Sequence, residues 1–157
     1  MLLERGAGPT QVLGAGRHFL RRFESVRDIL DLREFYRKRE EVETATRDGI
    51  KIVVRDVEAT FRLSTGKKQR TEIDPYPFSV QAARAAVYDR AVNNKGELSN
   101  WANGVIGTIS GRIGGWVASQ RLDRLTAPTE EDPRVAIRKT LQAKELRGQL
   151  KNMGAES

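Results

Sequence analysis

Thr46-Arg47-Asp48-Gly49-Ile50 is the stretch that decides the fold. It places an Asp-Gly pair between two segments of alternating residues. Asp-Gly favours a two-residue type I′ turn, because both central residues of that turn need a positive φ. The segment that follows, residues 50–63, alternates in the manner of a β-strand. The sequence therefore predicts a long antiparallel hairpin centred on this turn.

The alternation of residues 50–63 changes phase part-way along the segment. The apolar residues of 50–54 fall on one face, whereas those of 57–63 fall on the other. Since a strand cannot change faces without an extra residue, we expect a β-bulge near Arg55-Asp56. Such a bulge would bend the strand so that Ile52 and Phe61 both reach apolar contacts.

The order of the remaining patterns predicts a single domain over residues 1–157, with a β-rich half (1–63) and a helical half (79–154). Segments 2–5, 11–13 and 26–32 are further strand candidates, and residues 64–78 form a polar loop. Strands first and helices later indicate the α+β class. We expect a mostly antiparallel sheet packed against the C-terminal helices.

Three helices are expected in residues 79–154. Ser79 is a good N-cap for the first, and Asn93-Asn94-Lys95-Gly96 would stop it. The second begins near Ser99 and carries Gly107, Gly111 and Gly115 every four residues, a smooth ridge that we expect to pack closely on the sheet or on another helix. Asp132-Pro133, an N-cap with proline at N1, opens a last helix that Gly154 could end.

The composition excludes several kinds of chemistry. The chain has no cysteine and one histidine, His18, so disulfides and thiolate sites are excluded and little remains for a zinc site or a histidine relay. Gly14-Ala15-Gly16 lacks the third glycine of a dinucleotide fingerprint. We therefore expect no enzyme, no catalytic residue, no metal and no cofactor.

The net charge of +7 favours anionic partners. Most of the charge is dispersed, and the tight basic patch is the loop Lys67-Lys68-Gln69-Arg70. Lys67, Lys68 and Arg70 are therefore candidates for contact with an anionic surface. A basic nucleic-acid-binding module is the alternative function, although no nucleic-acid motif with interleaved aromatics is present. Peripheral membrane binding through the same charges, or through Phe19 and Leu20, is a third.

Taken in order, the segments resemble the SPFH or band 7 domain of the stomatin, prohibitin and flotillin families. The resemblance covers nearly the whole chain, and the order and spacing of its segments carry it. The matching segments are Glu4-Arg5-Gly6-Ala7-Gly8-Pro9, Gly14-Ala15-Gly16-Arg17-His18-Phe19-Leu20, Asp31-Leu32-Arg33-Glu34, Thr44-Ala45-Thr46-Arg47-Asp48-Gly49-Ile50, Thr60-Phe61-Arg62-Leu63 and Tyr76-Pro77.

The resemblance implies a membrane-associated scaffold that oligomerises and organises membrane proteins, proteases or microdomains. It also implies an N-terminal membrane anchor and a last strand that this chain lacks, so that the chain is an excised domain. No run reaches the roughly 18 apolar residues that span a bilayer, and we expect the fragment itself to be soluble. A missing strand would leave an open sheet edge, which predicts self-association.

Overall fold

The computed structural model describes residues 1–6, 8–90, 99–127 and 132–156. It confirms a mixed α+β fold with antiparallel sheets. In chain order the elements are β1 (Leu2–Arg5), β2 (Gly8–Val12), β3 (Ser25–Asp28), β4 (Phe35–Ala45), β5 (Lys51–Leu63), α1 (Val80–Tyr88), α2 (Trp101–Ser119), α3 (Leu122–Thr126), α4 (Pro133–Leu141), α5 (Lys144–Asn152) and β6 (Ala155–Glu156).

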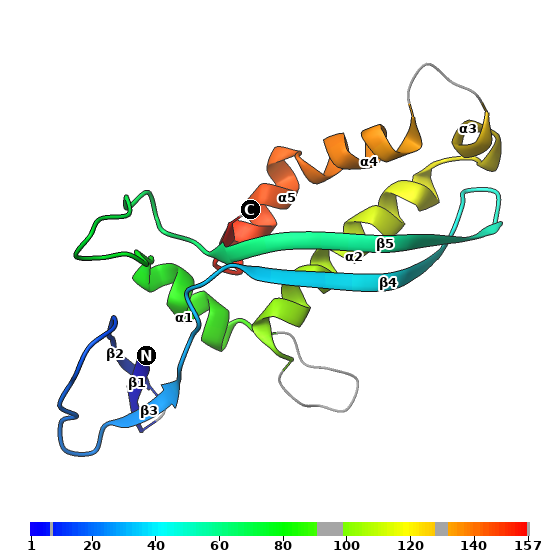
Figure 1. Cartoon of the computed structure of the whole chain (residues 1–157). Helices are drawn as coiled ribbons and strands as arrows, with labels where there is room; N and C mark the ends of the chain where they lie inside the picture. Colours follow the sequence, from blue (N-terminus) through cyan, green and yellow to red (C-terminus); the bar gives the residue numbers. More distant parts are fainter. Residues whose placement is uncertain (7, 91–98, 128–131, 157) are drawn as a thin grey trace.

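The strands form two separate three-stranded sheets, ordered β2-β1-β3 and β4-β5-β6. The first sheet lies at one end of the molecule, beyond α1, and the second runs along its length (Figure 1). The strand candidate at residues 26–32 is shorter than expected, because β3 ends at Asp28. The residues that precede the turn, from Phe35 to Ala45, form β4, and this strand includes most of the charged run.

The turn between β4 and β5 differs from the predicted two-residue type. The Thr46 N–H donates to the Ile50 carbonyl over 2.9 Å, which leaves residues 47–49 as a three-residue loop. Within this loop only Gly49 has a positive φ, 77°. A three-residue loop that ends in a left-handed residue is the next common hairpin connection, and glycine suits that position. The Asp-Gly signal located the turn correctly but indicated the wrong loop length.

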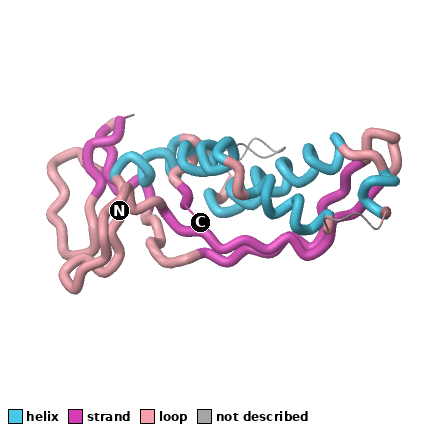
Figure 2. The backbone as a smooth tube through the Cα atoms, turned by 90° about the horizontal axis from the view of Figure 1, so that it is seen from above, coloured by secondary structure: helices cyan, strands magenta, loops and turns pink. Residues whose placement is uncertain are grey.

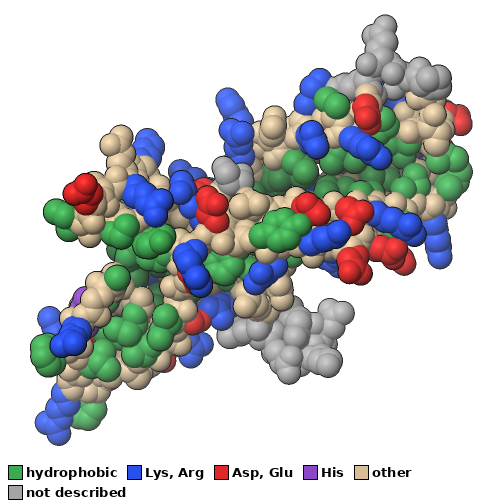
Figure 3. Space-filling view, viewed as in Figure 1, with side chains coloured by type: hydrophobic (Ala, Val, Ile, Leu, Met, Phe, Trp, Pro, Cys, Tyr) green, Lys and Arg blue, Asp and Glu red, His purple; other side chains and the backbone are tan. Residues whose placement is uncertain are grey.

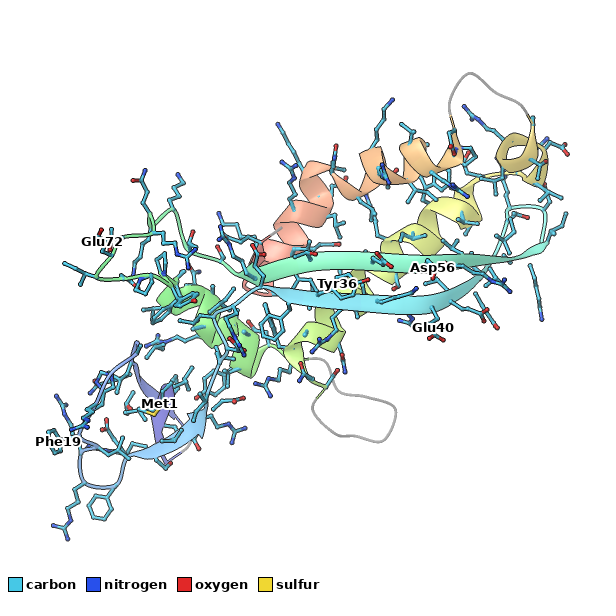
Figure 4. All side chains as sticks on the ribbon, viewed as in Figure 1. Met1, Phe19, Tyr36, Glu40, Asp56 and Glu72 are labelled. Atoms are coloured by element: carbon cyan, nitrogen blue, oxygen red, sulfur yellow. The ribbon has the colours of Figure 1, made fainter. Side chains whose placement is uncertain are left out.

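The predicted one-sided bulge at Arg55-Asp56 is wrong, because β4 and β5 change faces together. The register is the same on both sides of this point, with Arg39 opposite Val57 and Glu41 opposite Arg55. Asp56 has a φ of 55°, and it lies across from Glu40 in Figure 4. One left-handed residue therefore lets both strands turn their apolar residues to the same side.

The two halves of β5 contribute unequal amounts of buried apolar surface to that side. Phe61 is almost fully buried and Val54 packs against the core, whereas Ile52 is half-buried. Lys38 stabilises the strand pair at Asp56, where both strands change faces, since its Nζ lies 2.6 Å from an oxygen of Asp56. This hydrogen bond and charge lower the pKa of the Asp56 carboxyl below its ordinary value.

The core lies between β4–β5 and the helices. Figure 2 shows the described helices on one side of this strand pair only. At its centre, Trp101 meets the rings of Phe35 and Phe61 edge-on, each with a centroid separation of 5.6 Å. Edge-to-face aromatic pairs at this distance add to the stabilisation from buried area. Further along α2, the Thr44 hydroxyl donates to the Gly114 carbonyl over 3.2 Å and ties β4 to the helix.

The helix caps follow the sequence more closely than the helix lengths do. The side chains of Ser79, Asn100 and Asp132 cap α1, α2 and α4. The expected last helix is divided in two, because Gln142 and Ala143 separate α4 from α5. The short helix α3 was not predicted. The expected stop at residues 93–96 lies outside the described residues.

The glycine ridge of α2 does not pack closely as predicted. A Cβ atom built at Gly107, Gly111 or Gly115 would meet no described atom within 4 Å. The close contacts are instead made by Gly104, toward Met153, and by Gly114, toward Thr44. The spacing of four residues identified a common helix face, but the neighbouring elements lie beside it rather than on it.

Gly154 joins the C-terminus to the rest of the fold. It has a φ of 79°, and a Cβ atom there would lie 2.3 Å from the Ala82 carbonyl oxygen of α1. Its own carbonyl accepts the Ser64 N–H over 2.8 Å. These contacts bring β6 alongside the end of β5, where Ala155 pairs with Leu63.

Gly154→Ala should lower the free energy of unfolding by roughly 2–5 kcal/mol, since the left-handed backbone costs about 1–2 kcal/mol and the clash with α1 adds about 1–3 kcal/mol. Gly111→Ala is the matched control, because its Cβ enters open space inside a helix. It should raise stability by about 1 kcal/mol. Urea unfolding of both variants measures the two effects. Equal changes of the same sign in the free energy of unfolding would contradict the environments assigned to Gly154 and Gly111.

Candidate functional site

Five exposed apolar side chains lie in the N-terminal sheet and its loop, between residues 19 and 29. Phe19 is 100% exposed and Phe23 is 75% exposed. We call the set the apolar tip; its members are Phe19, Leu20, Phe23, Val26 and Ile29. Figure 4 places Phe19 at the far end of this sheet, away from the helices. Single exposed apolar residues are ordinary, but a group in one short segment indicates an interaction surface.

A tight turn holds the loop of the apolar tip in place. The Glu24 N–H donates to the Arg21 carbonyl over 3.0 Å, and the Arg21 N–H donates back to a Glu24 carboxylate oxygen over 2.9 Å. Accepting this bond lowers the pKa of the Glu24 carboxyl. Between them, Phe23 has a φ of 68°. A bulky residue in this conformation is strained, and such strain clusters at functional positions.

Arginines surround the apolar tip. The guanidinium carbon of Arg22 lies 4.8 Å from the centre of the Phe23 ring, and Arg5 donates to the Arg22 carbonyl over 3.2 Å. Arg17 and Arg21 are exposed on the same loop. Figure 3 shows hydrophobic side chains bordered by Lys and Arg over this end of the molecule. The chemistry of the surface is thus apolar at its centre and cationic at its edge.

The sheet that carries the apolar tip is fixed to the body of the protein. Leu2 and Leu3 of its central strand are buried. On the neighbouring strand, Asp28 forms an ion pair with Arg90, which follows α1 and whose side chain is largely buried. Arg90 also donates to the Ala86 carbonyl over 3.0 Å. The tip is therefore presented on a sheet anchored to α1.

The predicted anionic-contact residues Lys67, Lys68 and Arg70 lie together on the exposed loop between β5 and α1. Two of them are turned toward aromatic rings of the same loop. Lys68 Nζ lies 5.7 Å from the Phe78 ring centre, and Arg70 Cζ lies 5.1 Å from that of Tyr76. Such cation–π contacts at exposed sites are weak. The three residues share a loop but do not converge on one point.

A third surface lies along the outer edge of β4. Among the described residues, the sheet order gives β4 one strand neighbour, β5. On its other side is a groove of about 550 Å³ between β4 and α2, lined by Val42, Glu43 and the glycine ridge near Gly111. Because the ridge carries no side chains, the backbone edge of β4 is approachable along this groove.

Within the described residues, no group of three or more His, Cys, Asp or Glu side chains is placed to hold a metal ion. No helix among them has the length and apolar character to cross a membrane. No protein-family model matches the chain, and comparison with curated proteins and with solved structures finds no match either.

The sequence indicated part of these surfaces. It singled out Phe19 and Leu20 but missed Phe23, Val26 and Ile29; the last two fall in the strand candidate at residues 26–32. An apolar residue every three positions, at 20, 23, 26 and 29, was the available signal. The groove beside β4 was not predicted, since the glycine ridge was expected to be covered.

Proposed function

We propose that this protein is a non-enzymatic scaffold module that assembles with copies of itself at a membrane surface. The observation that carries the proposal is the open edge of β4, an eleven-residue strand with one strand neighbour in the part of the chain that the structure describes. Unpaired strand edges offer rows of N–H and C=O groups to another chain. Natural proteins usually shorten, cover or charge such edges; β4 carries charged side chains but is long, so its backbone edge can still pair with another chain.

The groove beside β4 supports strand addition as the mode of assembly. Peptides that add to a sheet edge gain main-chain hydrogen bonds, and neighbouring pockets select their side chains. Here Val42 supplies one apolar side chain among charged neighbours such as Arg39 and Glu41, and Gly111 leaves space for an approaching backbone. A second copy of this chain offers an extended segment with the same open edge.

The apolar tip supports the membrane part of the proposal. Exposed aromatic side chains insert at the boundary between headgroups and acyl chains, while nearby arginines attract anionic lipids. Phe19 and Phe23 with Arg21 and Arg22 offer this combination on one loop. The resemblance to SPFH domains agrees with such a location, and membrane proteins or proteases would be the clients of the assembled scaffold.

Gly111→Lys should weaken self-association about tenfold or more, because the new side chain fills the groove beside β4. Gly148→Lys on α5 is the matched control, since it adds the same charge at another open helical glycine. Light scattering across a concentration series measures the mass of each variant. Both changes should preserve the fold, because glycine is the poorer helix former at each position.

A wild-type protein that stays strictly monomeric at high concentration would contradict assembly by this chain. Equal weakening by both lysines would show that charge, rather than the β4 groove, controls the association.

The double variant Phe19→Ser/Phe23→Ser should lose most binding to vesicles that contain anionic lipid. Each substitution removes an exposed aromatic ring and leaves the buried core unchanged. Flotation with phosphatidylcholine vesicles, with and without phosphatidylserine, measures the binding. Ile73→Ser is the control, because Ile73 is 98% exposed on a different loop.

Retention of wild-type flotation by the double variant would remove the apolar tip from the proposal. An equal loss in Ile73→Ser would indicate nonspecific adsorption of exposed apolar groups instead of a defined membrane-contacting loop.

A further inference from the structure

A large groove lies between α1 and α5, on the side of the C-terminal turn. Its volume is about 1030 Å³, at the upper end of the range for ligand sites in proteins. The floor is formed by the apolar side chains of Ala82, Ala85, Leu150 and Ala155. In Figure 1, α1 and the C-terminal end of α5 both lie near the end of β5.

The walls of this groove are fixed by backbone contacts. The close approach of Gly154 to Ala82 joins α1 to the turn after α5. The Ser79 N–H donates to the Ser64 carbonyl, and the Ser64 N–H donates to the Gly154 carbonyl, each over 2.8 Å. A groove held in this way is preorganised, so a ligand would lose little free energy in shaping it.

Cationic side chains line both walls. Arg84 comes from α1, Arg147 and Lys151 come from α5, and Lys67 comes from the turn after β5. In the part of the chain that the structure describes, none of these four forms an ion pair. Other basic residues do, as Arg55 does with Glu41 at 3.4 Å. Charges of one sign in a concave site focus the electrostatic potential there.

The acidic residues of the groove do not neutralise these four cations. Glu156 is engaged elsewhere, because one of its oxygens accepts from Arg62 over 2.9 Å and the other accepts the Thr65 N–H over 3.1 Å. Asp89, at the C-cap of α1, forms no ion pair within the described residues, so the four cations outnumber the two acidic residues of the groove. The groove therefore has an excess of positive charge over an apolar floor.

We infer that this groove binds an acidic peptide segment of a partner protein. Arg147 and Lys151 stand one helical turn apart, about 6 Å along the axis of α5. Acidic side chains two residues apart in an extended peptide recur at about 6.6 Å, so an acid-X-acid segment matches this wall. Arg84 faces the peptide from α1, and the small alanines leave room for an apolar side chain between the carboxylates.

The size and spread of the groove favour a peptide over a single phosphate group. One phosphate would fill a small part of about 1030 Å³ and would need cations that converge on one point. Here the cations are distributed over three segments. The inference is independent of assembly through β4, and its readout does not involve self-association.

The test is fluorescence anisotropy with a labelled peptide of five Glu-Ala repeats, with Gln-Ala and Lys-Ala repeats as reference peptides. The wild-type chain should bind the Glu-Ala peptide alone. Arg147→Glu/Lys151→Glu should weaken this binding at least about tenfold. Arg134→Glu/Arg138→Glu is the matched control, because these exposed arginines have the same spacing on α4; it should change the binding less than about twofold. Arg147→Gln/Lys151→Gln provides the same comparison without charge reversal.

Three results would overturn the inference. The first is no binding of the Glu-Ala peptide by the folded wild-type chain. The second is an equal loss in the α4 control, which would assign the binding to general charge. The third is full displacement of the peptide by inorganic phosphate at equimolar concentration, which would make the groove a phosphate site. A groove variant that still assembles but no longer binds the peptide would support the inference and leave the proposed function intact.

Discussion

The contact on which the rest of the structure depends is that of Trp101 with the two strands and the C-terminus. Its ring packs edge-on against Phe35 of β4 and Phe61 of β5. Its indole N–H donates to the Met153 carbonyl over 2.7 Å. One side chain thus joins the start of α2, the sheet and the end of α5. A buried indole without this acceptor would cost about 1–3 kcal/mol.

The candidate functional surfaces follow from what this central contact leaves uncovered. Because Asp56 lets both strands turn their apolar residues toward α2, the helices need to cover only one face of β4–β5. The edge of β4 then remains open beside the glycine ridge. At the other end of α2, the turn at Gly154 brings α5 close to α1, and the cation-lined groove lies between these two helices. The apolar tip lies on a separate sheet, which the Asp28–Arg90 ion pair holds against α1.

Features that depend on a few adjacent residues could be predicted from the sequence. The way in which two elements pair or pack against each other could not. Helix caps such as Ser79 and the glycine of the β4–β5 turn depend on a few adjacent residues, so their positions were correct. The face change at Asp56 was located from β5 alone, but its form depends on β4, which changes faces at the opposite residue. The uncovered ridge at Gly111 and the groove between α1 and α5 depend on where other elements pack. No local pattern specifies that.

The exchange of the Trp101 indole proton with deuterium, followed by NMR, tests the central contact most directly. Trp101 is 8% exposed, and its proton should exchange only when the whole domain unfolds, with the same free energy of opening as the slowest amides of β5. Trp116, half-buried and without an indole hydrogen bond among the described residues, is the internal reference and should exchange much faster. Rapid exchange at Trp101 while the β5 amides stay protected would contradict the account.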